Sequence, residues 1–166
     1  MRDDPIALAA EHWAAHGWAD AADGMALVTS IVRVQQVLLA RIEATLRPAG
    51  LTFARFEVLR LLGFTRAGTL PIGKIGERLQ VHAASVTNAV GRLERDGLVT
   101  RTPNPDDGRS VLVTITDAGR QLVEKCTLQL NDVFRTIPLD DARQQAVFAA
   151  LRDIRHAHGD FVDTPV

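Results

Sequence analysis

Residues 72–99 of this 166-residue chain, IGKIGERLQVHAASVTNAVGRLERDGLV, determine the expected fold. Apolar residues recur at helical spacing in both halves of the segment: Ile72, Ile75 and Leu79 in the first, and Val86, Val90 and Leu93 in the second. Only about two residues separate the halves, so the two helices cannot lie antiparallel and must cross at a steep angle. That geometry is typical of a helix-turn-helix, whose second helix is expected from His82 to Asp96.

The residues after Gly97 change to the composition of a β-hairpin. Residues 98–101 and 111–115 are rich in β-branched side chains and are expected to form two strands. Between them, residues 102–110 contain two prolines and an Asp-Gly step, which favour a projecting turn. A hairpin in this position predicts a wing beside the helix-turn-helix.

Amphipathic helices are expected on both sides of the winged segment. On the N-terminal side, helices are expected at 5–16 and 25–47, and a third is capped by Thr52 and stops before Gly68. On the C-terminal side, a helix is expected from Thr116 to Pro138. A last helix follows it and carries Val147, Leu151, Ile154 and Phe161. The helix at 25–47 carries one long apolar stripe: Leu27, Ile31, Val34, Leu38, Ile42 and Leu46. A small winged lobe cannot cover that stripe, so a second copy of the chain is expected to bury it.

The expected fold class is mainly α with a small two- to three-stranded β wing (α+β). It is a winged helix-turn-helix at 51–118, flanked by dimerisation helices at 1–50 and 119–166. The helix at 5–16, with Trp13 and nearby Trp18, either wraps the partner or lines a ligand pocket.

Charge is distributed unevenly along the chain. The net charge is −1, but residues 51–120 carry ten basic and seven acidic side chains and therefore a charge of +3. An excess this small does not identify a DNA-binding protein, although it places any phosphate-facing surface in the middle of the chain.

The composition favours a cytoplasmic protein. No run of apolar residues approaches the roughly eighteen needed for a membrane span, and acids stand at the N-terminus where a signal peptide has bases. The single cysteine, Cys126, cannot form an internal disulfide, in keeping with a reducing compartment.

The second helix of the helix-turn-helix has a polar face suited to reading a DNA groove. Opposite its apolar residues lie Ser85, Thr87, Asn88, Arg92 and Arg95. Asparagine pairs with adenine in the major groove, serine and threonine bond bases or phosphates, and arginine contacts guanine or the backbone. An ordinary solvated helix face would show the same spacing, and that alternative stays open.

The order of elements and five short motifs resemble the multiple-antibiotic-resistance regulator family, MarR. The motifs are Leu51-Thr52 with Phe56 and Leu59, Ala84-Ser85-Val86-Thr87, Leu93-Glu94-Arg95-Asp96-Gly97-Leu98-Val99, Asp107-Gly108-Arg109, and Thr114-Ile115-Thr116-Asp117-Ala118-Gly119. The resemblance covers roughly residues 25–155. It implies a homodimer that binds double-stranded DNA, often a ligand-controlled repressor, with a pocket between helical and winged regions that often takes a small aromatic effector.

The chain departs from the family at the reading helix. The family usually has glycine where this chain has Gln80, a serine or aspartate N-cap where it has His82, and a basic residue where it has Asn88. Base readout is therefore expected to differ. Gly91 costs the helix roughly 1 kcal/mol relative to alanine; either it lets the backbone approach DNA closely or it has no functional role.

Further basic residues are candidates for DNA contact. Arg109 is expected at the wing tip, where its guanidinium can enter a narrow minor groove, held by a bidentate pair with Asp107 as in the family. The alternative is an exposed ion pair that contributes little to stability and has no role in DNA binding. The expected phosphate contacts are Lys74, Arg78, Arg95 and Arg101, each of which could equally be an ordinary surface charge.

Other classes of function are weakly supported. We find no Gly-rich phosphate loop and no Ser/His/Asp or Cys/His set, so no enzyme, metal or cofactor is expected. Cys126 falls on an apolar stripe with Leu122 and Leu130, which predicts a core cysteine rather than an oxidant sensor. The predicted function is a sequence-specific DNA-binding transcriptional regulator, a ligand-responsive repressor that binds a pseudo-palindromic operator as a homodimer. The alternative is a winged-helix module for protein contact or non-specific DNA packaging.

Overall fold

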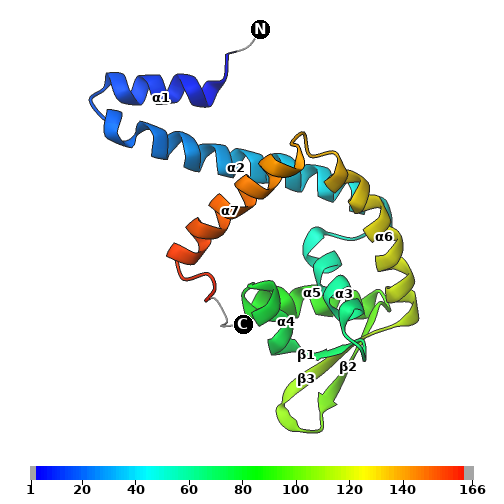
Figure 1. Ribbon diagram of the computed structural model, residues 1–166. Helices are drawn as coiled ribbons and strands as arrows, with labels where there is room; N and C mark the ends of the chain where they lie inside the picture. The colour runs from blue at the N-terminus through cyan, green and yellow to red at the C-terminus, as the bar shows by residue number, and fades with distance from the viewer. Residues whose placement is uncertain (1–2, 163–166) are drawn as a thin grey trace. The chain divides into compact units, whose positions relative to one another are not determined.

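The computed structural model describes residues 3–162. In chain order the elements are α1 (Pro5–Ala15), α2 (Ala19–Leu46), a 3-10 turn η1 (Arg47–Ala49), α3 (Phe53–Phe64), β1 (Thr69–Pro71), α4 (Ile72–Leu79), α5 (Ala83–Arg95), β2 (Val99–Asn104), β3 (Asp107–Ile115), α6 (Asp117–Arg135) and α7 (Asp141–Ala157) (Figure 1). The chain divides into two compact units, the first ending at Asn131 and the second beginning at Asp132. The expected fold class, mainly α with a small β wing, is confirmed.

Side-chain caps set the starts of several helices. The Thr52 hydroxyl accepts a hydrogen bond from the backbone N–H of Arg55 at 3.4 Å, and the Thr116 hydroxyl accepts one from Gly119 at 3.1 Å. Each bond satisfies a backbone donor that has no partner within its helix. Both capping predictions are therefore confirmed.

The first long helix starts earlier than predicted. α2 begins at Ala19 rather than near Met25, and Gly24 lies within it. Its first turn is rich in alanine, the strongest helix former, and Asp20 interacts favourably with the positive end of the helix dipole. Helix propensity outweighs the single glycine here.

The core of the first unit is built from α3, α5, α6 and the sheet. Its fully buried residues include Leu59 and Leu62 of α3, Val86, Val90 and Leu93 of α5, and Val123, Cys126 and Leu130 of α6. The predicted inward face of α5 is thus confirmed. On α6, Cys126 and Leu130 are buried as predicted, but the fully buried residue in the first part of the helix is Val123. Leu122, which was predicted there, packs at the edge of the core. Burying each large side chain contributes about 1.5–3 kcal/mol.

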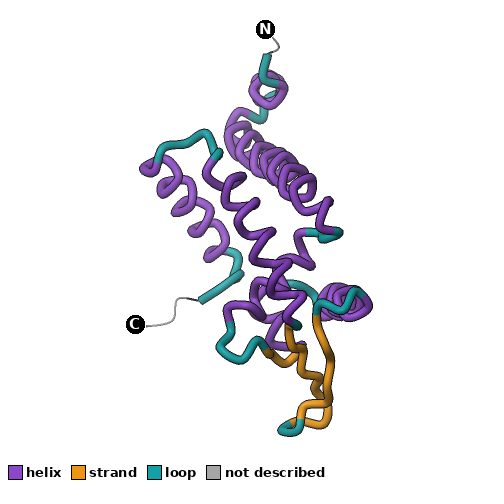
Figure 2. Tube along the Cα trace, turned by 90° about the vertical axis from the view of Figure 1, so that its right-hand side faces the viewer, coloured by secondary structure: helices purple, strands orange, loops and turns teal. Residues whose placement is uncertain are grey.

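The sheet has three antiparallel strands in the order β1-β3-β2. The strands are drawn in orange in Figure 2. β1 is short and was not predicted as a separate strand; it pairs with β3, with the hydroxyls of Thr69 and Thr114 hydrogen-bonded at 2.8 Å. β2 and β3 extend further than predicted, so the turn shrinks to Pro105 and Asp106. Pro103 is accommodated because β2 is an edge strand. Arg109 consequently lies on β3 rather than in the turn.

A close contact joins the wing to α6 at Gly119. A Cβ atom at this position would lie 2.2 Å from the backbone carbonyl oxygen of Leu98. The Thr116 hydroxyl also donates to the carbonyl of Gly97 at 2.8 Å. The start of α6 is therefore fixed against the end of the reading helix, which aligns the wing with that helix.

The α1–α2 segment leaves much apolar surface uncovered. Ala22 and Leu46 are the only buried residues of α2, and none of α1 is buried, while Trp13 and Trp18 pack together with ring centroids 5.2 Å apart. The exposed apolar side chains include Leu27, Val28, Val32, Val34 and Val37. By length and mean hydropathy (1.4) alone, Ala19–Ala49 could also cross a membrane, a property it shares with apolar helices of soluble assemblies.

The second unit contains α7, which also has exposed apolar residues. Asp140 caps it by accepting from the N–H of Arg143 at 2.9 Å. Exposed Val147 and Phe148 lie on α7. Phe161 was predicted on this helix but lies beyond its end at Ala157, where its ring contacts His156.

Candidate nucleic-acid interface

The turn between α4 and α5 has an unusual backbone conformation. Gln80 ends α4 with φ 54° and ψ 41°, and it is the only described non-glycine residue with positive φ. Residues other than glycine and asparagine rarely adopt this left-handed backbone conformation. At the position where the family resemblance implies glycine, Gln80 therefore adopts the left-handed conformation that glycine favours.

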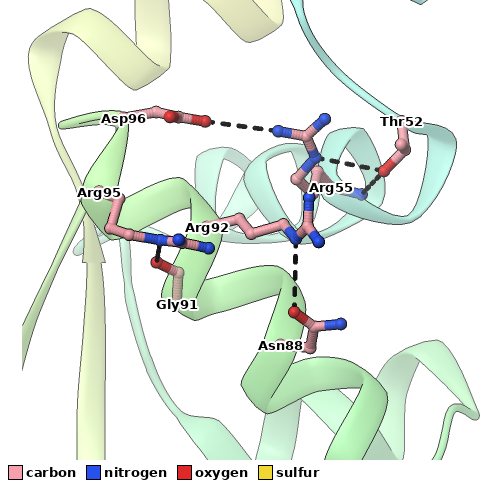
Figure 3. Close-up of polar contacts among 7 residues, drawn as sticks. All are labelled: Thr52, Arg55, Asn88, Gly91, Arg92, Arg95 and Asp96. Carbon is pink, nitrogen blue, oxygen red and sulfur yellow. Dashed lines mark hydrogen bonds and ion pairs between the residues drawn. The ribbon is translucent and has the colours of Figure 1, made fainter.

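α5 presents its five predicted polar residues to solvent. Ser85, Thr87, Asn88, Arg92 and Arg95 are all exposed, opposite the buried apolar face. Some of these groups bond to their own helix. The Thr87 hydroxyl donates to the carbonyl of Ala83 at 2.9 Å, and the Arg92 guanidinium donates to the Asn88 amide oxygen at 3.4 Å (Figure 3).

The N-terminal turn of α3 shares a hollow with this face. The hollow, of about 420 Å³, is lined by Thr52, Ala54 and Arg55 of the α3 region and by Ser85, Asn88, Ala89 and Arg92 of α5. Two guanidinium groups and several short polar side chains therefore line one depression. These groups suit contact with a DNA backbone, because all of them can donate hydrogen bonds to phosphate.

Arg55 is a candidate that the sequence analysis missed. Its side chain is only 15% exposed and donates to the Thr52 hydroxyl at 3.3 Å and to Asp96 at 3.4 Å (Figure 3). It thus connects the start of α3 to the end of α5. The Thr52 cap placed Arg55 in the first turn of a helix, but its approach to α5 depends on tertiary packing.

The wing residues are arranged differently from the expected bidentate pair. The Asp107 carboxylate accepts a hydrogen bond from the backbone N–H of Arg109 at 3.1 Å. Within residues 3–162 there is no ion pair between Asp107 and the Arg109 guanidinium. Asp107 therefore shapes the backbone at the start of β3, and the Arg109 side chain is exposed. The hairpin of β2 and β3 that carries it projects away from the neighbouring helices (Figures 1 and 2).

The predicted phosphate contacts differ in how they are held. Lys74 is paired with Glu77 at 2.7 Å, and the Arg95 guanidinium donates to the carbonyl of Gly91 at 3.3 Å. Arg78 is exposed on α4. All three can reorient toward a ligand at low cost because they lie at the surface.

Arg101 is held more firmly than the other basic residues. Its guanidinium donates to the Glu94 carboxylate at 2.8 Å, which links β2 to α5. The hydrogen bond from Arg101 lowers the pKa of Glu94, and Glu94 in turn raises the pKa of Arg101. A phosphate contact by Arg101 would therefore have to share the guanidinium with Glu94.

The described residues offer little for other chemistry. Residues 3–162 contain no group of three or more His, Cys, Asp or Glu side chains that could hold a metal ion. Cys126 has no exposed surface, and burial raises the pKa of its thiol. Because the reactive form of cysteine is the thiolate, this environment disfavours oxidant sensing.

Comparisons with known proteins identify relatives over different parts of the chain. The profile of the MarR family matches residues 51–111. The organic hydroperoxide resistance transcriptional regulator of Bacillus subtilis is 38% identical over 42% of this chain, and the match covers 47% of that regulator, about half its length. Sco5413, a MarR family transcriptional regulator from Streptomyces coelicolor, is 50% identical, with 85% of this chain and 99% of that chain covered and a TM-score of 0.77.

A structure solved with DNA has the same fold. Sco3205, a MarR family transcriptional regulator from Streptomyces coelicolor solved in complex with DNA, is 20% identical, with 79% of this chain and 84% of that chain covered and a TM-score of 0.73. The 50% identity to Sco5413 over nearly its full length goes beyond shared fold. The chain therefore belongs to the MarR family of transcriptional regulators.

Proposed function

We propose that this regulator binds duplex DNA as a symmetric homodimer, with α5 in the major groove and the wing in the adjacent minor groove. The observation that carries the proposal is the exposed polar face of α5, which is backed by fully buried Val90 and Leu93. A rigid helix that displays short polar side chains near its N-terminus and arginines further on has the layout of a recognition helix.

Base and backbone contacts are assigned to different side chains. Ser85, Thr87, Asn88 and Arg92 are proposed to contact base edges, and Arg109 the minor groove, with Asp107 shaping the strand that carries it. Lys74, Arg78, Arg95 and Arg101, with Arg55 added from the structure, are proposed to contact phosphates. The three-part division at residues 50 and 118 remains our proposal for how DNA binding and dimerisation are separated.

Dimerisation follows from the uncovered apolar surface of α2. Val28 is 61% exposed and Val32 is 51% exposed, and a soluble monomer rarely leaves so many adjacent apolar side chains in water. Arg33 lies in the middle of the same helix, where insertion into a bilayer would cost about 2.5–3.5 kcal/mol. A second copy of the chain explains α2 better than a membrane does, and we propose a cytoplasmic protein.

The regulatory output is proposed from family resemblance. We propose that a small aromatic effector relieves repression by binding more tightly to a conformation of the protein that does not bind DNA. We also propose that the chain has no enzymatic activity. Regulation of transcription by this chain would require DNA binding and a change in DNA affinity when an effector binds, and neither step is a catalysed reaction.

Fluorescence anisotropy tests the DNA-binding proposal. The protein is titrated onto DNA from the region upstream of its own coding sequence and onto a scrambled duplex, across a salt series. A sequence-reading dimer should prefer the upstream DNA by about a thousandfold or more at physiological salt. Equal affinities with a steep salt dependence would instead favour the packaging alternative, and absence of binding to either duplex would contradict the proposal.

A further inference from the structure

His82 caps the reading helix in a way that defines the chemistry of its ring. The Nδ1 atom of His82 accepts a hydrogen bond from the backbone N–H of Ala84 at 3.2 Å. A ring nitrogen that accepts carries no proton, so in the neutral imidazole the proton resides on Nε2. The cap therefore leaves His82 with a donor on its second nitrogen. Because His82 is exposed, this donor is accessible at the start of α5.

The surroundings of His82 leave room for a ligand beside the ring. A hollow of about 570 Å³ between α4 and α5 is lined in part by Gly73, Glu77, Gln80, His82 and Thr87. The glycine has open space at its Cβ position. The Glu77 carboxylate on this hollow is paired with Lys74 at 2.7 Å.

The neighbouring hydroxyl does not supply the same donor. Thr87 uses its hydroxyl proton within the helix, on the carbonyl of Ala83 at 2.9 Å. Within residues 3–162, no hydrogen bond from the Nε2 atom of His82 is recorded. The imidazole N–H therefore supplies a side-chain donor on this hollow that a ligand can use without breaking an internal bond.

We propose that His82 is a positioning residue for DNA: Nδ1 caps α5 while Nε2–H donates to a backbone phosphate and so fixes how the helix enters the groove. This inference rests on the proposed function, because it needs DNA against α5. A phosphate is favoured over a base edge because the free N–H groups and the dipole at a helix N-terminus already attract anions. Phosphate contacts set the register of a reading helix on the duplex.

Serine separates the two roles of His82. A serine at this position is a strong N-cap, but its one hydroxyl lies much closer to the backbone than the Nε2 atom of histidine and cannot extend to the same phosphate. We expect His82→Ser to unfold at the wild-type temperature and to bind the upstream duplex about ten- to a hundredfold more weakly, as for the loss of one hydrogen bond to a charged group. His82→Ala should show the same loss of affinity together with a lower unfolding temperature.

Neutral phosphate analogues locate the contact. Single phosphates of the upstream duplex are replaced one at a time by methylphosphonates, and anisotropy is measured with wild-type protein and His82→Ser. The inference expects one position in each half-site at which the analogue weakens wild-type binding but causes no further loss for His82→Ser. This coupling would not arise if His82 acted only as a cap.

The outcomes separate this inference from the proposed function. His82→Ser with wild-type affinity would overturn the positioning role. The role would also be overturned if the effect of His82→Ser were coupled to deazapurine substitutions, which remove a base acceptor, and not to methylphosphonates, which remove a phosphate charge. If wild-type protein bound neither the upstream nor the scrambled duplex, the proposed function would fail and this inference with it. Wild-type binding with an unaffected His82→Ser overturns the inference alone.

Discussion

Arg109 illustrates how one side chain can be kept available for DNA. Asp107 bonds the backbone N–H of Arg109 and so shapes the strand without engaging the guanidinium. The cation is exposed on a hairpin only two residues from the turn at its tip. A long, planar cation in this position can enter a narrow minor groove, where the negative potential is enhanced.

Arg109→Ala should therefore weaken DNA binding. We expect a loss of about tenfold, within the roughly 1–3 kcal/mol typical of one specific arginine contact, and unchanged thermal stability because the side chain is exposed. Anisotropy on the upstream duplex measures the affinity. Arg66→Ala removes the same charge from an exposed residue outside the proposed contacts and serves as the control; equal losses for both variants would contradict a specific role for Arg109.

Cys126 should behave as a core residue. Its side chain has no exposed surface and burial raises the pKa of the thiol, so little thiolate is present or accessible. A maleimide reagent should leave the native protein unlabelled and should label it fully in denaturant, as mass spectrometry can show. Rapid labelling of the folded protein would contradict this assignment and restore oxidant sensing as a possibility.

At the scale of elements, the alignment of the reading helix and the wing depends on the start of α6. Gly119 lies against the Leu98 carbonyl so closely that any Cβ would overlap the backbone oxygen. Backbone atoms cannot move aside as the end of a flexible side chain can. The absence of a side chain at Gly119 therefore allows α6 to dock against the wing.

Gly119→Ala should destabilise the fold. Overpacking of this kind costs about 1–3 kcal/mol or more, and chemical denaturation measures the change in the free energy of unfolding. Gly91→Ala is the matched control, because Gly91 lies within α5 with open space at its Cβ position. It should gain roughly 1 kcal/mol from helix propensity. A Gly119→Ala variant as stable as wild type would contradict the proposed contact.

The sequence predicted those elements whose signal is local. Hydrophobic spacing located α4 and α5, and the hydroxyls of Thr52 and Thr116 marked the starts of α3 and α6. β1 was not predicted separately because three residues carry no periodicity and the strand exists only by pairing with β3. The predicted wing turn was too long because Pro103, taken from the sequence alone, indicates the end of a strand. An edge strand such as β2 tolerates proline.

Only part of the candidate site was predicted, because only some of its residues are placed by local spacing. The polar face of α5 follows from its buried face, so Ser85, Asn88 and Arg92 could be placed together from spacing. Arg55 could not, because only the packing of α3 on α5 brings it to the same hollow. The cap formed by His82 was suggested by position, but which ring nitrogen it uses is a matter of side-chain geometry.

At the scale of the whole molecule, the exposed apolar surface of α2 indicates that two copies of the chain associate. The core of the first unit is complete without most of α2, whose apolar side chains remain exposed. A symmetric dimer that buries them would relate its two reading helices by a twofold axis. Dimerisation and operator symmetry are thus linked.

Val32→Glu should separate the dimer. A carboxylate on this exposed apolar surface would be costly to bury at an interface, whereas the core of the first unit does not include Val32. Light scattering should give the 18.1 kDa mass of one chain for the variant and twice that mass for wild type. Val32→Leu keeps the apolar surface and should remain dimeric; a wild-type monomer would contradict the proposal.

Hydroxyl-radical footprinting of wild-type protein on its upstream DNA tests the central claim most directly. A dimer that reads DNA with two copies of α5 should protect two pseudo-symmetric half-sites whose centres lie about 34–36 Å apart, one turn of the duplex. Protection in the adjacent minor grooves should disappear with Arg109→Ala. Uniform protection without half-sites, unchanged by substitutions on α5 or the wing, would contradict sequence reading by this helix.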